Sequence, residues 1–289
     1  MTNTIGIISA LYARPFTREH FGAFARAKAA GCDFVELLVP EPGELDLEAT
    51  RKALAGQGLG VALAARVNLQ RDLASSDAAC HEAGVRYLES CVQIAGRLGA
   101  TIVGGPLYGA PLVFAGRAPA PVEESERQRR LDRIVDGLRP ADAGVKLAIE
   151  PLNRFETDIA NTTGHGLQLV EAVGSPAVGL MLDTFHMNME DYSITDSIRR
   201  AAPHLIHFQA CENNRGYVGA GHIDWPDVAR TLAAIGYRGA ITLEPFRRND
   251  ERAGVPLAQW RPPDGSEDAQ LAHSVAFLRA TLDYAWRQQ

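Results

Sequence analysis

Four oxygen-bearing side chains recur in the second half of the sequence, each at the end of a short apolar run. Glu150, Asp183, Gln209 and Glu244 end these runs and are separated by 33, 26 and 35 residues. Three carboxylates brought to one place repel one another and are costly to remove from water unless a cation lies among them. Oxygen ligands in this number favour a hard divalent cation such as Mg²⁺ or Mn²⁺. A single acid of this kind is more often a helix-cap partner or a solvated rim residue, so it is the repeated spacing that predicts a metal site.

Three further polar residues follow these ligand candidates by three to six positions. They are Glu156, His186 and Arg215, and we expect each of them in a loop at the same edge as the ligands. A carboxylate, an imidazole and a guanidinium around a hard metal suit a polyhydroxylated substrate that is held through its oxygen atoms. Taken singly, each residue is equally compatible with an ordinary surface position.

His207 stands two residues before Gln209. Because side chains alternate along a strand, His207 is expected to point the same way as Gln209, one layer deeper. Two interpretations remain open at this point: His207 either supports a ligand from behind or is a core histidine.

Eight short apolar runs extend along the whole chain, at an average spacing of about 36 residues. Their apolar character is continuous rather than alternating, as in parallel strands that are covered on both faces. The predicted strands are 4–9, 34–38, 60–65, 101–105, 146–150, 178–183, 205–209 and 240–244.

Helical patterns lie between these runs. Apolar residues at helical spacing precede Gly99 in one segment and Pro140 in another, and Asp224 followed by Pro226 indicates the start of a third helix. Eight strand–helix units in one order predict an α/β fold, a single (β/α)8 TIM barrel over residues 1–289. A doubly wound sheet is the rival, but it usually carries a glycine-rich phosphate loop after an early strand, and the sequence has none.

Two segments are longer than a barrel requires, 107–122 and 247–266. Loops that follow barrel strands form the functional face, so both segments are candidate pocket walls. Surface excursions or contacts between subunits explain them equally well.

Composition excludes several classes of protein. The chain holds 29 Lys and Arg against 35 Asp and Glu, a net charge of −6. An acidic chain without a basic run is a poor partner for nucleic acid or for an anionic membrane. No apolar run approaches a membrane span, the N-terminus lacks the pattern of a signal peptide, and the four cysteines are scattered. We therefore expect a cytoplasmic protein that binds neither nucleic acid nor membrane.

Long motifs in the second half identify a resemblance. The runs are IEPLNRFETD (149–158), LDTFHMNMED (182–191), HFQACENNRG (207–216), GHIDW (221–225) and LEPF (243–246). Together they resemble the ketose 3-epimerase family, the tagatose and psicose 3-epimerases, which belongs to the xylose-isomerase-like TIM barrels.

The resemblance implies a set of metal ligands. Glu150, Asp183 and Glu244 match the family's metal-binding positions, and Gln209 stands where these epimerases normally carry a fourth ligand, a histidine. A glutamine at this position is instead similar to hydroxypyruvate isomerases of the same superfamily. The implied cofactor is a divalent metal, Mn²⁺ or Mg²⁺, with Co²⁺ as a further possibility.

The resemblance also implies roles in the reaction. Glu150 and Glu244 would exchange protons with the sugar, while Glu156, His186 and Arg215 would hold its oxygens near C1 to C3. A metal on the carbonyl and a neighbouring hydroxyl stabilises a cis-enediolate, and two glutamates on opposite faces then invert C3 of a free ketose. Moving the proton between C1 and C2 with the same groups gives aldose–ketose isomerisation.

The main expectation is therefore an isomerase, a metal-dependent sugar epimerase that forms a homodimer or homotetramer. A hydroxypyruvate-type or other aldose–ketose isomerase is the first alternative. A remote alternative is a metallohydrolase similar to the AP endonucleases, which would need more histidine ligands and a DNA-binding surface. A non-catalytic sugar-binding protein is the third, and it would not require two acid–base carboxylates.

Overall fold

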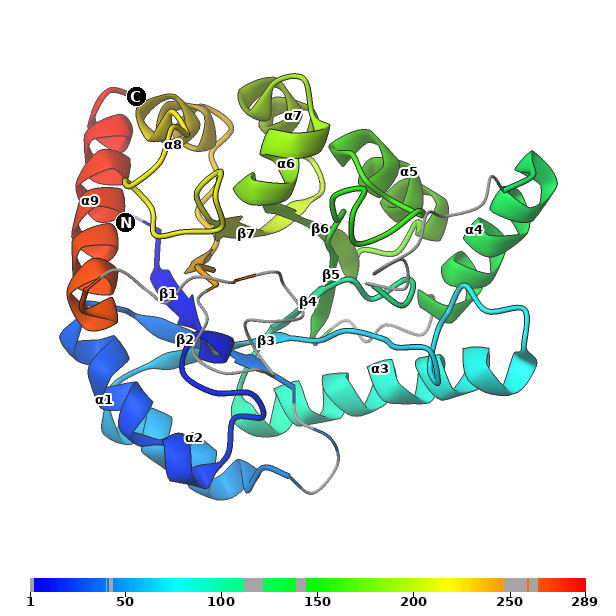
Figure 1. The fold of residues 1–289 in the computed structure, drawn as a ribbon, viewed down its shortest axis with the longest axis horizontal. Helices are drawn as coiled ribbons and strands as arrows, with labels where there is room; N and C mark the ends of the chain where they lie inside the picture. The colour runs from blue at the N-terminus through cyan, green and yellow to red at the C-terminus, as the bar shows by residue number, and fades with distance from the viewer. Residues whose placement is uncertain are drawn as a thin grey trace.

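Eight parallel strands pair in chain order, and β8 pairs with β1, so that the sheet closes into a barrel. The computed structural model describes residues 3–39, 41, 44–111, 122–138, 144–246, 259 and 265–289. Helices surround the strands on the outside, as Figure 1 shows. The predicted (β/α)8 barrel is confirmed.

The strand boundaries agree with the predicted ones to within one residue. The strands are β1 (Ile5–Ile8), β2 (Phe34–Leu38), β3 (Gly60–Ala64), β4 (Ile102–Gly105), β5 (Lys146–Ile149), β6 (Val178–Asp183), β7 (Leu205–Ala210) and β8 (Ile241–Leu243). Two of the ligand candidates, Glu150 and Glu244, thus come directly after β5 and β8 rather than ending them.

The helices cover the outer face of the barrel and begin and end at recognisable signals. They are η1 (Ser9–Leu11), η2 (Arg18–His20), α1 (Gly22–Ala29), α2 (Leu47–Gly56), α3 (Ala78–Leu98), α4 (Glu124–Leu138), α5 (Thr163–Val173), α6 (Thr184–Glu190), α7 (Ile194–Ala201), α8 (Trp225–Ala234) and α9 (Glu267–Arg287). As predicted, Gly99 ends α3 in the left-handed conformation with φ 82°. The Asp224 carboxylate caps α8 by accepting a hydrogen bond from the Asp227 N–H at 2.9 Å.

The register of the last three strands brings the ligand candidates to adjacent levels of the barrel. Asp183 on β6 lies beside Gln209 on β7, and Gln209 lies beside Thr242 on β8. Glu244 is two residues beyond Thr242 and lies on the same side of its strand, one layer nearer the mouth. The carboxyl ends of parallel strands therefore collect these polar groups, as the spacing predicted.

Most of the two long segments lies outside the described residues, which end at Pro111 and begin again at Val122 in the first case. The second is described only at Gln259 and at its last two residues, Gly265 and Ser266. Their role as pocket walls stays a prediction. Among the described helices, none is both long and apolar enough to cross a membrane.

Gly105, at the end of β4, lies where the ends of β3 and β4 approach each other closely at the mouth of the barrel. Its φ is +131°, and a Cβ built on it would collide with the carbonyl oxygen of Ala65. Its own carbonyl accepts a hydrogen bond from the N–H of Glu150 at 3.1 Å. The close approach of β3 to β4 at this point thus fixes where the chain enters the ligand region.

We expect Gly105→Ala to destabilise the fold more than a matched glycine substitution does. Gly99→Ala is the control, because Gly99 also has a positive φ but has nothing within 4 Å of an added Cβ. The control should lose about 1–2 kcal/mol from backbone strain alone, and Gly105→Ala should lose at least about 1 kcal/mol more through overpacking. Unfolding in urea measures both. Equal losses would contradict this account of Gly105.

Candidate active site

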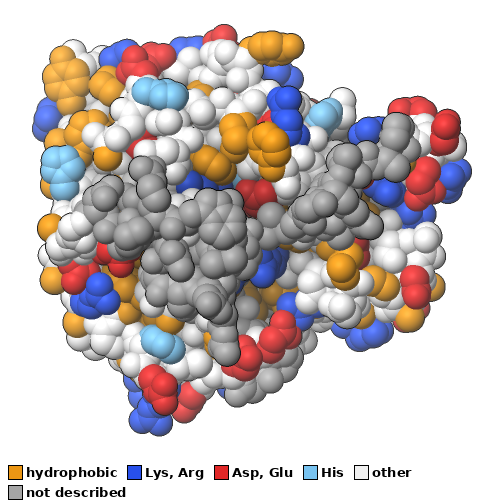
Figure 2. Space-filling view, in the orientation of Figure 1, with side chains coloured by type: hydrophobic (Ala, Val, Ile, Leu, Met, Phe, Trp, Pro, Cys, Tyr) orange, Lys and Arg blue, Asp and Glu red, His pale blue; other side chains and the backbone are white. Residues whose placement is uncertain are grey.

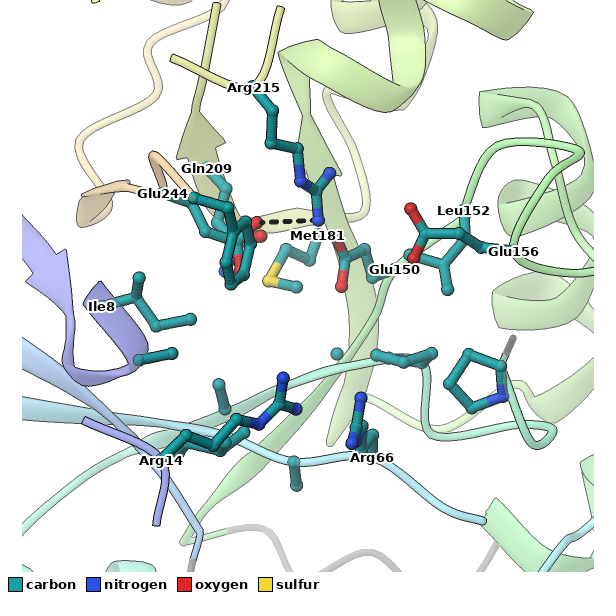
Figure 3. Close-up of a pocket in the computed structure, with 18 residues that line it drawn as sticks. Ile8, Arg14, Arg66, Glu150, Leu152, Glu156, Met181, Gln209, Arg215 and Glu244 are labelled. Carbon is teal, nitrogen blue, oxygen red and sulfur yellow. Dashed lines mark ion pairs between the residues drawn. The ribbon is translucent and has the colours of Figure 1, made fainter. Parts of the chain in front are cut away.

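A cavity opens at the carboxyl ends of the strands. Five of the predicted site residues line it: Glu150, Glu156, Gln209, Arg215 and Glu244 (Figure 3). In the space-filling view, acidic and basic side chains are visible next to one another near the centre of this face (Figure 2). The predicted residues from β5, β7 and β8 and the segments that follow them are therefore brought to one place.

The other two predicted site residues, Asp183 and His186, do not line this cavity but lie next to Glu150, which does. Asp183 and His186 are buried, and a ligand atom of each lies within 4.8 Å of one from Glu150, the arrangement of a possible metal site. The His186 Nε2 is 3.5 Å from Glu150 Oε1 and 3.6 Å from Asp183 Oδ2. The expectation that His186 sits in a loop was wrong. It lies on α6, because Asp183 caps that helix by accepting a hydrogen bond from the Phe185 N–H.

Burial sets the protonation of the acidic groups. Loss of water raises the pKa of Glu150 and of Glu244 well above the ordinary value, and the neighbouring carboxylates raise them further. Burial also raises the pKa of Asp183 to about 6, against the opposing charge of Arg215. The fold therefore gathers carboxylates where their charges are costly, which is the situation that a bound cation relieves.

Gln209 is oriented by a buried acid that the sequence did not point to. Its Nε2 donates a hydrogen bond to Glu36 Oε1 at 2.8 Å, and Glu36 is a fully buried residue of β2. Glu36 Oε2 is 2.6 Å from His207 Nε2 and accepts a hydrogen bond from the Thr242 hydroxyl. Burial alone would raise the pKa of Glu36, but His207, Thr242 and Gln209 outweigh it and lower that pKa. His207 is thus the supporting residue beneath Gln209, one of its two interpretations.

Two buried oxygen atoms of the site without a hydrogen-bond partner among the described residues fit a hard metal ion. Gln209 Oε1 and Glu244 Oε2 are buried, and neither has a hydrogen-bond partner in the described part of the chain. Since Glu36 takes the amide nitrogen of Gln209, Oε1 is the atom that this side chain can offer to a cation. Amide and carboxylate oxygens are the ligands that Mg²⁺ and Mn²⁺ prefer.

Asn153 holds two of the predicted substrate-binding residues. Its backbone N–H and its Nδ2 donate to His186 Nδ1 at 3.0 and 2.9 Å, and Nδ2 also donates to Glu156 Oε1 at 2.9 Å. Burial, together with the charge of Arg215, lowers the pKa of His186 well below its usual range, so the ring is neutral. Nδ1 accepts from the fixed backbone, and Nε2, on the other side of the ring, lies near the carboxylates and 3.0 Å from Nη1 of Arg215, a nitrogen that can only donate.

Arg215 is placed by a strained turn and by two aromatic rings. Its φ is +61°, unusual for a residue with a side chain, and its guanidinium lies 4.3 Å from the Phe185 ring centre and 4.7 Å from that of Phe246. Nη1 is 3.4 Å from Asp183 Oδ2, and Nη2 is 3.8 Å from Glu244 Oε2. Burial alone would lower the pKa of Arg215, but the surrounding carboxylates raise it, so the charge is permanent.

The turn that carries Arg215 is held from below by Glu212. This buried carboxylate accepts hydrogen bonds from the Gly219 N–H at 2.8 Å and from the Trp225 indole at 2.7 Å. The Glu212 carbonyl in turn accepts from the Arg215 N–H at 2.9 Å. The loop after β7 is therefore fixed at its base, and the guanidinium is aimed by a rigid segment.

Sequence reasoning missed the residues that support the site. Glu36, Asn153 and Phe185 make contacts that no spacing indicated. Only Glu36 left a signal, since it is the single charged residue in the apolar run of β2. A charge in a strand that is covered on both faces needs a buried partner, and here that partner comes from β7.

The fold and site define a class. The family model described as the xylose isomerase-like TIM barrel matches residues 24–281. The chain therefore belongs to that family.

Comparison with individual proteins shows which members of this family the chain resembles. The chain is 32% identical to the L-ribulose 3-epimerase of Mesorhizobium japonicum over 91% of this chain and 89% of that protein. It is also 32% identical to the D-psicose 3-epimerase of Agrobacterium fabrum, over 91% and 93% of the two chains. A solved structure of L-ribulose 3-epimerase superposes with a TM-score of 0.90 at 31% identity, covering 99% of this chain and 96% of that one. The resemblance to ketose 3-epimerases is confirmed.

The crowding of acids gives a prediction for the metal-free protein. Because the folded pKa of Glu150 lies above its ordinary value of 4.5, the folded state keeps a proton that the unfolded state has released. The contribution of Glu150 to stability is therefore lost as pH rises from 4.5 through the folded pKa. We expect Glu150→Gln in EDTA to gain a few degrees of melting temperature relative to wild type between about pH 5 and about pH 8.

Thermal melts with and without Mn²⁺ check this. The exposed Glu82→Gln controls for the loss of one negative charge. Added Mn²⁺ should reverse the order, because the wild type keeps the carboxylate ligand and the variant does not. A difference that does not vary with pH would contradict the placement of Glu150 among repelling charges.

Proposed function

We propose that this protein is a metal-dependent epimerase that inverts C3 of a ketose. The pair Glu150 and Glu244 carries the proposal. These carboxylates come from β5 and β8, line the same cavity, and lie on either side of Met181 in its wall (Figure 3). The ketose 3-epimerase relatives support the choice of substrate class.

Four residues would hold the divalent ion. Glu150, Asp183 and Glu244 would contribute carboxylate oxygens, and Gln209 would contribute the Oε1 that has no other partner among the described residues. The hardness of this oxygen set supports Mn²⁺ or Mg²⁺. When bound, such an ion stabilises the negative charge that develops on the substrate oxygens as the proton leaves carbon.

The two glutamates move the proton. One carboxylate takes it from C3, and the other delivers a proton to the opposite face, which inverts that carbon. Burial, which raises the pKa of both groups, also allows each to hold a proton between the two steps. Which glutamate acts first depends on the direction of the reaction.

Three polar residues hold the sugar. His186 and Arg215, whose Nε2 and Nη1 lie 3.0 Å apart, would hold neighbouring substrate oxygens, and Arg215 would supply a permanent charge beside them. Glu156, which Asn153 fixes, would accept a hydroxyl proton.

Proton transfer between C1 and C2 is the second candidate activity. Gln209, which stands where the epimerases have histidine in the stated resemblance, is the observation that keeps a hydroxypyruvate-type isomerase in view. The same two carboxylates would serve it, and only the placement of the substrate differs. The relatives named above support the epimerase.

We also propose a cytoplasmic homodimer or homotetramer. Phe155 and Tyr192 are large exposed side chains on segments that the Arg154–Glu190 ion pair joins, which supports a surface for a second copy. The four cysteines are free thiols, which supports a reducing compartment.

Replacing either glutamate tests the proposed reaction. With Mn²⁺ added, Glu150→Gln and Glu244→Gln should each lower kcat by at least about 100-fold, the scale of positioned acid–base catalysis. Ketohexoses and ketopentoses are screened in deuterated water, and products are separated by chromatography. Deuterium should appear at C3, and the exposed Glu82→Gln should behave as wild type. Product without deuterium at C3 would refute the mechanism, and deuterium at C1 or C2 would favour the isomerase.

Replacing Gln209 tests the ligand set. An amide oxygen is a harder donor than imidazole nitrogen, so Gln209→His should raise affinity for Co²⁺ and Ni²⁺ relative to Mg²⁺. Titration calorimetry on the metal-free protein measures the ratio in both forms. An unchanged ratio would show that Gln209 does not contact the ion.

A further inference from the structure

The half of the cavity wall that faces the carboxylates is built from β1 to β4 and the segments that follow them. In the described structure it is apolar except for two arginines. Arg14 and Arg66 extend into the cavity from this side, opposite Glu150, Arg215 and Glu244 (Figure 3). Charge is thus divided across the cavity, with the acids on one wall and two guanidinium groups on the other.

Arg66 follows β3 and is partly withdrawn from water. Loss of water lowers its pKa, against the attraction of Tyr87 and Glu156. No carboxylate of the described residues lies within ion-pair distance of its guanidinium, although many other arginines of the chain are paired. A positive charge in this position has lost part of its hydration without gaining a counter-ion in return.

Arg71, a nearby arginine, has both an ion-pair partner and an aromatic partner. It forms an ion pair with Glu41 at 2.6 Å and lies 3.6 Å from the centre of the Tyr87 ring. Arg14, Arg66 and Arg71 together line an adjoining pocket. Arg14 and Arg66 also line the catalytic cavity, so they stand where the two spaces meet.

We propose that Arg14 and Arg66 form an anion subsite that binds a negatively charged group, a phosphate or a carboxylate, at the end of the ketose remote from C3. Guanidinium groups match the planar oxygens of both anions and bind them through paired hydrogen bonds. The preferred substrate therefore carries a terminal charge that a neutral ketose lacks. This inference rests on the proposed function, because that function fixes which end of the sugar is held by the acidic wall.

The direction of the sugar follows from the layout. The groups that would hold oxygens near C1 to C3 are Glu156, His186 and Arg215, which all come from the segments after β5, β6 and β7. With those carbons at the acidic wall, the rest of the chain extends toward the wall built by β1 to β4. The polar side chains it meets there are Arg14 and Arg66.

A neutral sugar end does not account for this wall. Hydroxyl groups are recognised adequately by uncharged side chains, whereas the Arg66 guanidinium has lost hydration and has no carboxylate of the described residues at ion-pair distance. An anionic group at the end of the sugar supplies that counter-ion. A charge-assisted contact of this kind is stronger than a neutral hydrogen bond, and it changes the selectivity for a ligand by about 10- to 100-fold.

Three matched substrates test the subsite. D-fructose, D-fructose 6-phosphate and D-fructuronate, which has a carboxylate at C6, differ only at the remote end. With Mn²⁺ added, wild type should show kcat/KM for at least one anionic substrate about tenfold or more above that for D-fructose. The phosphate and carboxylate arms identify which anion fits, and preference for either one supports the proposal.

Three variants separate the subsite from a general loss of activity. In Arg66→Gln, the ratio of kcat/KM for the anionic substrate to that for D-fructose should fall by about tenfold or more. Arg66→Lys keeps the charge, and the ratio should fall less. Arg86→Gln removes an exposed charge on α3, far from the cavity lining, and should leave the ratio at the wild-type value.

Two results would overturn the inference while the proposed function stands: equal kcat/KM for neutral and anionic ketoses, or a ratio unchanged in Arg66→Gln and Arg14→Gln. Both presuppose that D-fructose is epimerised. Failure of all three substrates and of the wider ketose screen would refute the proposed function itself, and the inference with it.

Discussion

The repulsion among three buried carboxylates is the constraint around which the site is organised. Glu150, Asp183 and Glu244 are withdrawn from water, which raises the pKa of each, and the cation lying among them in the described structure is Arg215. An unfavourable arrangement of this kind persists only when the surrounding fold fixes it. The backbone does so, because strand pairing sets the level of Asp183 and a carbonyl of β4 receives the N–H of Glu150. The stability of the barrel therefore offsets the unfavourable free energy of keeping three carboxyl groups buried at a site that can bind a cation.

The neighbouring side chains are held so that they do not neutralise these acids. Glu36 takes the amide nitrogen of Gln209 and so leaves its oxygen as the atom available to a cation. Asn153 occupies Nδ1 of His186, so that only Nε2 of the ring faces the carboxylates and Arg215. Aromatic rings on both sides of Arg215 restrain its guanidinium. In each case a second residue makes one contact and thereby determines which atom of the first remains for chemistry.

The strands and the acids that follow them could be predicted from the sequence because both depend on local, periodic properties. Continuous apolar runs are a property of single segments, and one barrel unit between successive acids is enough to place them at one edge. Glu36 could not be placed in this way, since its partner is 173 residues away and the pairing depends on barrel closure. The position of His186 was misjudged because a ligand role was preferred to a helix-cap role for Asp183, whereas Asp183 caps α6. Arg14 and Arg66 lie in irregular segments after β1 and β3, where periodicity carries no information.

The two walls of the cavity come from different halves of the chain, which explains why the resemblance to a family indicated the chemistry better than the substrate. The motifs that carry it begin at Ile149, so they cover the strand ends that supply the acids, His186 and Arg215. The opposite wall comes from the first half of the chain, and its two arginines lie outside every one of those motifs. In a barrel each strand contributes its own loop to the mouth, so the residues that move protons and the residues that select the far end of the substrate can change independently. A chain that keeps the acidic wall and places arginines on the other retains the reaction and alters what the cavity admits.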